Sequence, residues 1–444
     1  MRRGLLVGLA AASVGLIYGY DLAIIAAVQL FVDFARTTLQ REVLTTMVVI
    51  GQIFGVLGAG VLANAIGRKK SVVLVLVAYA MFALLGAVSV SLAMLLTARF
   101  LLGLSIGVSM VVVPVYVAES APAAVRGSLV TAYQLAIVSG LIAGYLTGYL
   151  LAGAHGWRWM LGLAVLPAIV LLLLVIRLPD SPRWYMLKGR VDDARATLLR
   201  VEPTANADAE LAEIRRALSE GSGGISEMLR RPYSRATAFV ILLGLLIQIT
   251  GINAFVYYSP EIFKDMGFSG YFARLAVPAL VQVAGLAAVG ISVLLVDRVG
   301  RRPILLFGIA MMIAADIVLM VVFSRGLGGA IFGFGAVLLF IIGYTLGFGS
   351  LGWVYASESF PTRLRSLGSS TMLTANLMTQ AVVAGGFLTM KEALGGAGTF
   401  AVFGAFAVVS FVFVFRYAPE TKGRQLEDIR HFWENGGQWE KTRA

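Results

Sequence analysis

Residues 248–260 read QITGINAFVYYSP and end a long apolar run that begins near Ala236. A membrane span needs about 20 mostly apolar residues, so this run is long enough to cross a bilayer. Amide and hydroxyl groups at that depth cost free energy unless they face a partner or water. Gly251 and Pro260 also loosen the helix, which a bilayer tolerates only where neighbours or a cavity satisfy the backbone. The stretch is typical either of a breakable half-helix that lines a cavity or of hydrogen bonds between packed helices.

The composition of the whole chain favours the membrane. Of its 444 residues, 59% are hydrophobic and only 14% are charged, whereas soluble domains are roughly 25% charged. The absence of cysteine excludes disulfides and thiolate metal sites, and two histidines are too few for a metal cluster. The net charge of +12 resides largely in short loops between apolar runs, which indicates membrane topology rather than a nucleic-acid partner.

Twelve apolar windows can be marked along the chain, and each is long enough to cross a bilayer. The alternation of polar and apolar residues that a membrane barrel requires is missing. We therefore expect an all-α membrane protein with 12 transmembrane helices. The windows are residues 5–28, 43–66, 71–90, 92–117, 128–151, 157–178, 236–260, 273–297, 303–323, 330–355, 366–390 and 396–417.

The distribution of lysine and arginine predicts the orientation of these spans. With the N-terminus placed in the cytoplasm, 28 of the 36 basic residues fall on the cytoplasmic side and seven on the other, while Arg99 lies inside a span. The bias remains when the long central loop is left out. We therefore expect a multi-pass protein of the inner (plasma) membrane with both termini cytoplasmic.

One sizeable polar insert, residues 179–235, divides the spans six and six. Its segments 191–199 and 207–218 have helical spacing, so we expect short helices at the membrane face. The four expected parts are an N-terminal six-helix bundle at 1–178, an intracellular helical linker at 179–235, a C-terminal six-helix bundle at 236–417 and a cytoplasmic tail at 418–444.

The two halves repeat each other. The segment VYVAESAP at 115–122 matches VYASESFP at 354–361, an offset of 239 residues, and Arg126 matches Arg365 at the same offset. A six-span unit in duplicate predicts two pseudo-symmetric bundles with a substrate held between them near the bilayer midplane. The sequence therefore predicts a transporter.

Basic residues cluster in the turns after spans two and eight, NAIGRKK at 64–70 and DRVGRRP at 297–303. Their cations can pair with glutamates at the cytoplasmic ends of spans four and ten, which would latch a gate in one state and release it in another. One such motif is explained by membrane topology alone, but repetition at matching offsets favours a gate. The gate residues that we predict are Arg68, Glu119, Arg126, Arg301, Glu358 and Arg365.

Together these segments resemble the major facilitator superfamily, and specifically its sugar porter family, from end to end. The most specific signatures are PDSPR at 179–183 and PETKGR at 419–424, whereas the loop at 297–302 is shared by the whole superfamily. The remaining signatures are PVYVAE at 114–119 with Arg126-Gly127, and QITGIN at 248–253. The resemblance implies the major facilitator fold and transport by alternating access.

The resemblance also implies which polar residues hold the cargo. Amides offer a donor and an acceptor to vicinal hydroxyls, and an aromatic face packs on the C–H face of a sugar ring. Tyr257 and Tyr258 are placed to close the outer side. The substrate-binding residues that we expect are Gln134 in the N-terminal half and Gln248, Asn253, Tyr257, Trp353 and Asn376 in the C-terminal half.

Asp21 lies inside the first span and Arg99 inside the fourth. A charge at membrane depth is by default functional and should have a partner. By resemblance to proton-linked members of the family, such as the xylose transporter, the Asp21 carboxyl is the proton site and Arg99 its partner. The alternative is a static buried ion pair. Asp316 in span nine lies outside the expected site, and we expect it to make a local helix contact.

Several departures from the family pattern limit the choice of cargo. Ile247 replaces the first of two consecutive glutamines, and Leu377 replaces a second tryptophan. Ser350 and Gly352 replace a proline hinge before Trp353. Asn64-Ala65 replaces an Asp-Arg pair, so the N-terminal latch should be the weaker one. The pocket is therefore more apolar than a hexose site.

The main hypothesis is a proton-coupled symporter of a monosaccharide or polyol. The alternatives are a proton-linked porter of a small organic or aromatic acid and an uncoupled sugar facilitator. A nutrient sensor would need an output domain, and an enzyme would need a nucleophile–base pair in a credible context. We expect no cofactor beyond the proton gradient, no nucleic-acid partner, contact with the lipid bilayer and function as a monomer.

Overall fold

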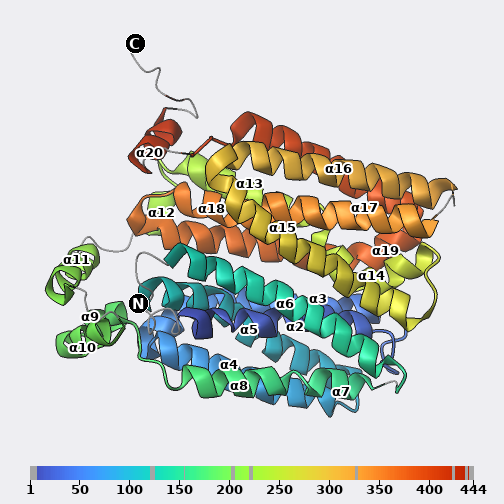
Figure 1. Ribbon diagram of the computed structural model, residues 1–444, viewed down its shortest axis with the longest axis horizontal. Helices are drawn as coiled ribbons and strands as arrows, with labels where there is room; N and C mark the ends of the chain where they lie inside the picture. The colour runs from blue at the N-terminus through green and yellow to red at the C-terminus, as the bar shows by residue number, and fades with distance from the viewer. Residues whose placement is uncertain are drawn as a thin grey trace. The chain divides into compact units, whose positions relative to one another are not determined.

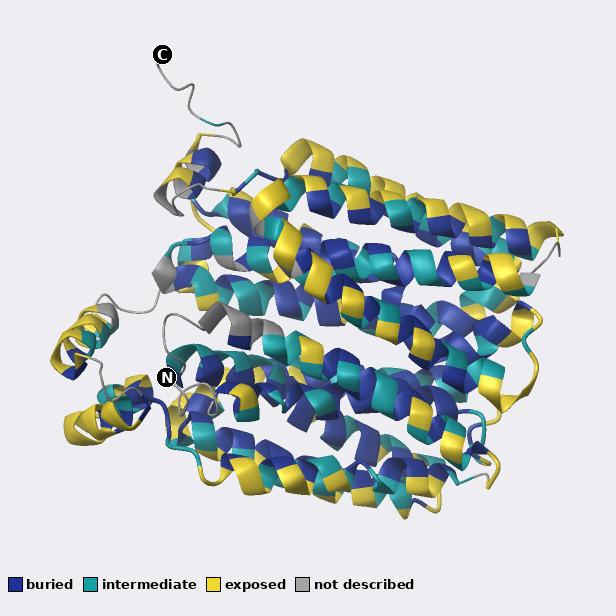
Figure 2. Ribbon diagram, viewed as in Figure 1, coloured by how far each residue is buried: buried dark blue, intermediate teal, exposed yellow. Residues whose placement is uncertain are grey.

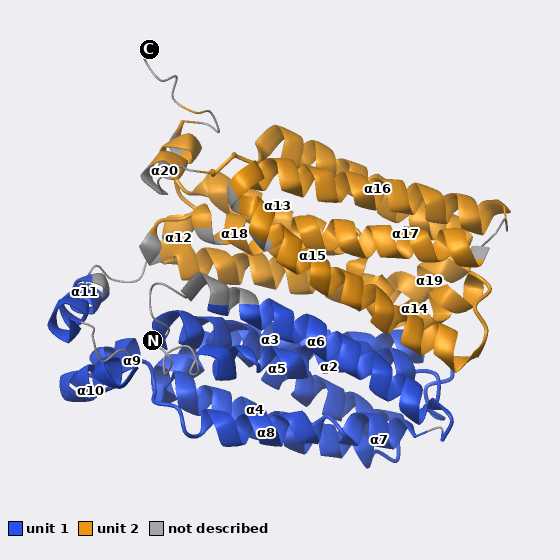
Figure 3. Cartoon of the chain, in the orientation of Figure 1, with its two compact units in different colours: residues 1–221 blue, residues 222–444 orange. Residues whose placement is uncertain are grey.

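The computed structural model describes residues 8–120, 126–154, 156–201, 206–219, 224–325, 329–422, 426–435 and 439. Every regular element in these ranges is a helix, which confirms the expected all-α class. The chain divides into two compact units, residues 1–221 and 222–444 (Figure 3). The boundary between them lies inside the polar insert that separates the two sets of spans. The finer four-part division stays a prediction.

The long helices of the first unit lie side by side (Figure 1). The first span is helical from residue 8 and continues as α2, and the sixth span consists of two shorter helices. Thr37 and Gln40 form a capping box that starts the second span, because each side chain accepts a hydrogen bond from the backbone amide of the other. The helices are α2 (Gly15–Val28), α3 (Thr38–Ile66), α4 (Arg68–Ala87), α5 (Leu92–Ser120), α6 (Arg126–Ala152), α7 (Trp157–Gly162) and α8 (Val165–Val175).

The second unit repeats this plan with more interruptions. Two of its helices contain a π-helical turn, η2 and η3. The elements are α13 (Ser234–Ile249), α14 (Ile252–Asp265), η2 (Phe272–Ala276), α15 (Val277–Val299), α16 (Arg301–Arg325), α17 (Gly329–Tyr344), η3 (Thr345–Gly349), α18 (Ser350–Glu358) and α19 (Thr362–Tyr417).

Helix α19 contains two of the expected spans. The described residues include 11 helices long and apolar enough to cross a membrane, and the last is 54 residues long. At 1.5 Å per residue that length is about 80 Å, well over twice the hydrocarbon thickness of about 30 Å. Gly395 has φ +69 and ψ 174, which breaks the helix in its middle. Counted as two, α19 brings the spans to the 12 that the sequence predicts.

Short helices fill the insert and the tail. They are α9 (Pro182–Leu187), α10 (Val191–Val201), α11 (Ala207–Ser219), α12 (Ile225–Met228) and α20 (Leu426–Glu434). The expected helices near 191–199 and 207–218 therefore form. Arg195 of α10 and Asp208 of α11 make an exposed ion pair at 2.9 Å. In the tail, Trp433 packs on Phe239 of α13 with ring centroids 5.1 Å apart.

Large apolar side chains are exposed along the outer faces of the spans (Figure 2). On α8 the exposed apolar residues are Leu166, Ile169, Val170, Leu173 and Leu174. Contiguous apolar surface of this extent is unfavourable in water and is what a lipid-facing helix presents. The burial pattern therefore agrees with a multi-pass membrane protein.

Candidate functional site

An amide network surrounds the break in the seventh span. Gln248 lies at the end of α13 and Asn253 at the start of α14. Gln248 donates through Nε2 to Asn376 Oδ1 of α19 at 2.9 Å, and Asn253 donates through Nδ2 to Gln248 Oε1 at 2.6 Å. All three side chains are buried. The second unit thus brings together three of the predicted substrate-binding residues.

Gly251 makes this break possible, as its sequence position suggested. It has φ +92, in the left-handed region where side chains other than glycine are strained. A Cβ atom there would lie 2.7 Å from the ring of Phe403. Further along α14, Tyr258 has non-helical φ and ψ of −117 and 16, two residues before Pro260. The predicted loosening at both positions is confirmed.

Tyr257 makes a further polar contact between α14 and α19, one helical turn along from the amide network. It lies four residues after Asn253 on α14, and Gln380 lies four residues after Asn376 on α19, so each pair shares a helix face. Gln380 donates through Nε2 to the Tyr257 hydroxyl at 2.8 Å. Its Oε1 atom is buried and has no hydrogen-bonding partner among the described residues. Gln380 was not among the predicted site residues, although its i+4 spacing from Asn376 could have revealed it.

The apolar departures from the family pattern are buried. Ile247 and Leu377 are both inaccessible to solvent. Ile247 packs against span ten. Its Cδ1 atom would lie 2.7 Å from a Cβ atom placed on Gly352. Trp353, the next residue, is 40% exposed on α18. The π-helical turn η3 precedes α18, and Ser350 Oγ donates to Thr345 O at 2.8 Å. An altered helical turn thus stands where the family's proline hinge is missing.

Gln134 belongs to the first unit. It lies on α6 and is half-buried. Its place beside the amide network of the second unit stays a prediction.

Asp21 of α2 and Arg99 of α5 form a buried ion pair through Oδ1 and Nη1. Each side chain is 2% exposed. Asp21 Oδ2 and Arg99 Nε and Nη2 are buried without a hydrogen-bonding partner among the described residues. A buried pair with so many unsatisfied atoms recovers only part of its desolvation cost. The predicted partnership is present, and three of its polar atoms have no hydrogen-bonding partner among the described residues.

Asp316 makes the local helix contact that the sequence predicted, but without a hydrogen bond among the described residues. It lies on α16 with 1% exposure, and neither carboxyl oxygen has a hydrogen-bonding partner among the described residues. Its neighbour is Gly404 on α19, where a Cβ atom would lie 3.2 Å from the Asp316 Cβ. The contact is therefore one of packing alone.

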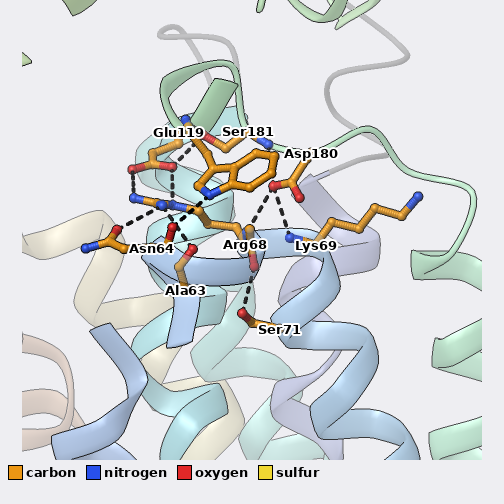
Figure 4. Close-up of polar contacts among 10 residues, drawn as sticks. Ala63, Asn64, Arg68, Lys69, Ser71, Glu119, Asp180 and Ser181 are labelled. Atoms are coloured by element: carbon orange, nitrogen blue, oxygen red, sulfur yellow. Dashed lines mark hydrogen bonds and ion pairs between the residues drawn. The ribbon is translucent and has the colours of Figure 1, made fainter. Parts of the chain in front are cut away.

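Arg68 lies at the centre of a polar cluster in the first unit (Figure 4). It donates to both carboxyl oxygens of Glu119, through Nε at 2.9 Å and Nη2 at 3.3 Å. Its Nη1 atom donates to Asn64 Oδ1 at 3.1 Å and Ala63 O at 3.2 Å. Ser181 Oγ donates to Glu119 Oε2 at 2.5 Å. This places a residue of the PDSPR segment in contact with one of the predicted gate residues.

Asp180 caps the start of α4 in the same cluster (Figure 4). Its Oδ1 atom accepts from the backbone amides of Arg68 at 2.9 Å and Lys69 at 3.2 Å. A carboxylate at a helix N-terminus satisfies free amides and complements the helix dipole. Gly67 has φ +103, and a Cβ atom on it would overlap the Asp180 carboxylate. The glycine in the basic turn is required for this close approach.

The second unit repeats the arrangement. Glu420 of the PETKGR segment accepts from the backbone amides of Arg301 at 3.1 Å and Arg302 at 3.0 Å, and Gly300 has φ +114. Arg301 Nη2 lies 3.7 Å from Glu358 Oε1. Burial raises the pKa of the Glu358 carboxyl, and the charges of Arg301 and Arg365 oppose that shift.

The two arginine–glutamate pairs differ in geometry, and the expectation that the N-terminal latch is the weaker one stays a prediction. The Arg68–Glu119 pair is bidentate at 2.9 and 3.3 Å, whereas the Arg301–Glu358 pair is separated by 3.7 Å. Asn64 explains the difference, because its side-chain oxygen helps to orient Arg68. The side chain of Arg126 lies outside the described residues.

The chemistry of these sites is that of hydrogen bonding and charge pairing. Among the described residues no three His, Cys, Asp or Glu side chains are placed to hold a metal ion. The amide network can exchange hydrogen bonds with a polyhydroxylated molecule. The buried ion pair can exchange its internal partner for a proton.

Comparisons with known proteins agree with this chemistry. The family model "Sugar (and other) transporter" matches residues 7–433. The galactose-proton symporter of Escherichia coli K12 is 35% identical over 94% of this chain and 92% of its own length. The arabinose-proton symporter of Bacillus subtilis is 33% identical over 97% and 95%. Polyol transporter 5 of Arabidopsis thaliana is 30% identical over 98% and 86%.

Solved structures share the fold. The xylose transporter XylE of E. coli, in a partially occluded inward-open conformation, has a TM-score of 0.85 at 24% identity, over 96% of this chain and 100% of that chain. A major facilitator superfamily proton:xylose symporter, XylE bound to 6-bromo-6-deoxy-D-glucose, has a TM-score of 0.82 at 25% identity, over 98% and 99%. With the family model matched along almost its whole length, the chain belongs to the sugar porter family of the major facilitator superfamily.

Proposed function

We propose that the chain is a proton-coupled symporter that carries a monosaccharide or a polyol by alternating access. The buried network of Gln248, Asn253 and Asn376 is the observation that carries this proposal. Carboxamides can both donate to and accept from the hydroxyls of such a cargo. The names of the relatives, which state galactose-proton symport, arabinose-proton symport and polyol transport, support the same cargo class.

In this proposal the cargo exchanges hydrogen bonds with the network. Gln248 and Asn376 now satisfy each other, and so do Gln248 and Asn253. A sugar hydroxyl can replace any of these partners at little net cost, because one hydrogen bond is traded for another. Tyr257 and Trp353 supply ring faces for the apolar side of the sugar, and Gln134 would contribute from the first unit.

The proton acts through Asp21. While ionised, the carboxylate holds Arg99, and proton binding removes the charge that attracts the guanidinium. A symporter requires the proton to have different affinities for its conformations. Arg99 provides that difference if its distance from Asp21 changes between them. The Arg68–Glu119 and Arg301–Glu358 pairs would close the cytoplasmic gate, together with Arg126 and Arg365.

The alternative cargoes and mechanisms have less support. An organic-acid porter should present a cation to its substrate, whereas the network consists of amides and a tyrosine. An uncoupled facilitator does not require a carboxylate that is buried in its first span and paired with an arginine of another span.

The proposed location is the plasma membrane, with both termini in the cytoplasm. The 28 to seven distribution of basic residues supports this orientation. We propose that the monomer is the functional unit, because each expected site lies within one chain.

Asp21→Asn tests the coupling. The variant cannot ionise at this position, so purified protein in proteoliposomes should lose proton-driven accumulation and keep sugar counterflow. Asp316→Asn is the matched control, since it changes another buried aspartate outside the site and should retain accumulation. Accumulation against a gradient by the Asp21→Asn protein would refute the assignment.

The cargo can be tested by thermal shift. Purified wild-type protein would be heated with pentoses, hexoses, polyols and aromatic acids. We expect stabilisation by sugars or polyols, because a ligand that binds only the folded state raises its apparent stability. Stabilisation confined to carboxylic acids would contradict the sugar assignment.

A further inference from the structure

The first span contains a tight turn just below Asp21. The amides of Val14 and Ile17 donate three residues back, to Ala11 O at 3.1 Å and Val14 O at 3.3 Å. This is the 3₁₀ pattern, which within a helix often marks a hinge or strain. Regular helix resumes as α2 at Gly15. Asp21 is therefore carried by a helix whose lower end can bend.

Tyr79 of α4 holds the turn that lies between this hinge and Asp21. Its hydroxyl donates to Ile17 O at 3.2 Å, and its side chain is 1% exposed. In an α-helix the Ile17 carbonyl accepts from the amide four residues ahead, which is that of Asp21. Tyr79 is thus bonded to the same carbonyl that anchors the Asp21 backbone.

Other neighbours fix the remaining sides of α2. The Tyr20 hydroxyl donates to Met160 O at 2.7 Å. Gly19 lies so close to α6 that a Cβ atom on it would overlap the Ile137 carbonyl. Arg99, by contrast, has Nε and Nη2 buried without a hydrogen-bonding partner in the described part of the chain. The α2 backbone is therefore held on several sides, whereas the long Arg99 side chain is bound only through Nη1 among the described residues.

We propose that Tyr79 is a positioning residue for the proton site. By holding the turn that precedes Asp21, Tyr79 prevents α2 from bending when a proton binds. Proton binding then releases Arg99 from the carboxylate. This inference rests on the proposed role of Asp21 as the proton carrier. Without the Tyr79 hydroxyl, α2 can follow Arg99, and the cycle can proceed without a proton.

Few titratable or charged groups of the described residues lie around Asp21. On elements packed against α2, Arg158 of α7 is turned to Ser89 O at 3.1 Å, and the ring of Tyr133 of α6 lies against Gly15, well below Asp21. Among the described residues, Arg99 of α5 interacts electrostatically with Asp21, and Asp21 in turn acts on Tyr79 of α4 and on the adjacent Tyr20.

Tyr79→Phe removes the hydroxyl and keeps the ring. Full-length protein in proteoliposomes would be given a pH gradient and radiolabelled D-galactose, replaced by L-arabinose or sorbitol where the wild type accumulates that compound more strongly. We expect the accumulation ratio to fall about fivefold, the change in an equilibrium that corresponds to one neutral hydrogen bond of about 1 kcal/mol. Uptake should also depend less steeply on pH, while counterflow stays within about twofold of wild type.

Tyr355→Phe is the matched control. Tyr355 is also buried and donates to a backbone carbonyl, Pro419 O, at 3.0 Å, but it lies in the second unit. It should keep the wild-type accumulation ratio and pH profile. A Tyr79→Phe protein with unchanged accumulation and pH profile would overturn the inference, and so would one that loses counterflow.

The two proposals fail separately. If Asp21→Asn still accumulates sugar, the role of Asp21 is wrong whatever Tyr79→Phe does. If Asp21→Asn loses accumulation and Tyr79→Phe behaves as wild type, only the role of Tyr79 is wrong.

Discussion

Gln380 extends the amide network by one side chain. Its amide donates to the Tyr257 hydroxyl, while Oε1 is buried without a hydrogen-bonding partner in the described part of the chain. Such an acceptor costs free energy until a donor reaches it. A sugar hydroxyl that enters the network when the site opens can supply that donor. The lost amide at Ile247 would then have a counterpart on span eleven.

Gln380→Leu should therefore weaken sugar binding about fivefold, the effect of one neutral hydrogen bond. Equilibrium binding of radiolabelled sugar to purified protein would measure it. Gln29→Leu is the control, because Gln29 Nε2 makes a similar buried bond to Thr45 Oγ1 at 2.9 Å in the first unit. It should leave sugar affinity unchanged, and equal losses in both variants would argue against a role for Gln380 at the site.

Single residues divide into those that the sequence reveals and those that need the fold. Gln248, Asn253 and Asn376 could be predicted because amides within apolar spans are conspicuous. The contact of Asn64 with Arg68 needs the fold, since it depends on reaching across one helical turn. Gln380 was not predicted, although its i+4 spacing from Asn376 is visible in the sequence, because its contact with Tyr257 joins residues 123 positions apart.

The interrupted seventh span is the element that determines the geometry of the amide network. Gly251 joins α13 to α14 in a left-handed conformation, and this join sets the amide of Gln248 against that of Asn253. A continuous helix would turn these side chains differently, because residues five apart do not share a face. The break is thus part of the site and not merely a tolerated defect.

Gly251→Ala should disrupt this element. Alanine in the left-handed region costs about 1–2 kcal/mol, and the added methyl group would also press on Phe403. We expect a lower unfolding temperature and weaker sugar binding, measured by thermal shift with and without sugar. Gly290→Ala is the control, because Gly290 lies in α15 with no atom within 4 Å of the added carbon. Unchanged sugar binding in Gly251→Ala would show that the site does not need the break.

At the level of elements, the apolar windows predicted the spans well because hydrocarbon thickness imposes a minimum length on each. The joints between spans were less predictable. The break at Gly395 lies between the windows 366–390 and 396–417, as predicted, but the sequence did not predict that spans eleven and twelve form one helical element. The π-helical turn η3 had no sequence signal beyond the missing proline.

The topology of the whole molecule can be tested without removing any native thiol, because the chain contains no cysteine. Ser269→Cys follows α14, and Ser219→Cys ends α11 in the insert. In intact cells a membrane-impermeant maleimide should label only Ser269→Cys, and opened cells should label both. Labelling of Ser219→Cys in intact cells would reverse the proposed orientation. The positive-inside rule makes this prediction from sequence alone.

The caps at Asp180 and Glu420 have a consequence for how the protein is assembled. Each carboxylate follows the last span of its unit and binds the start of that unit's third span. In each half, the segment after the last span is therefore bound to the start of the third span of the same half. The chain between the halves then serves only to connect them. Two separate polypeptides, 1–221 and 222–444, should consequently restore sugar uptake when produced together in one cell, and neither should do so alone. Asp180→Ala in the first fragment should weaken that rescue, because the fragment loses the bonds that hold its end to the start of α4.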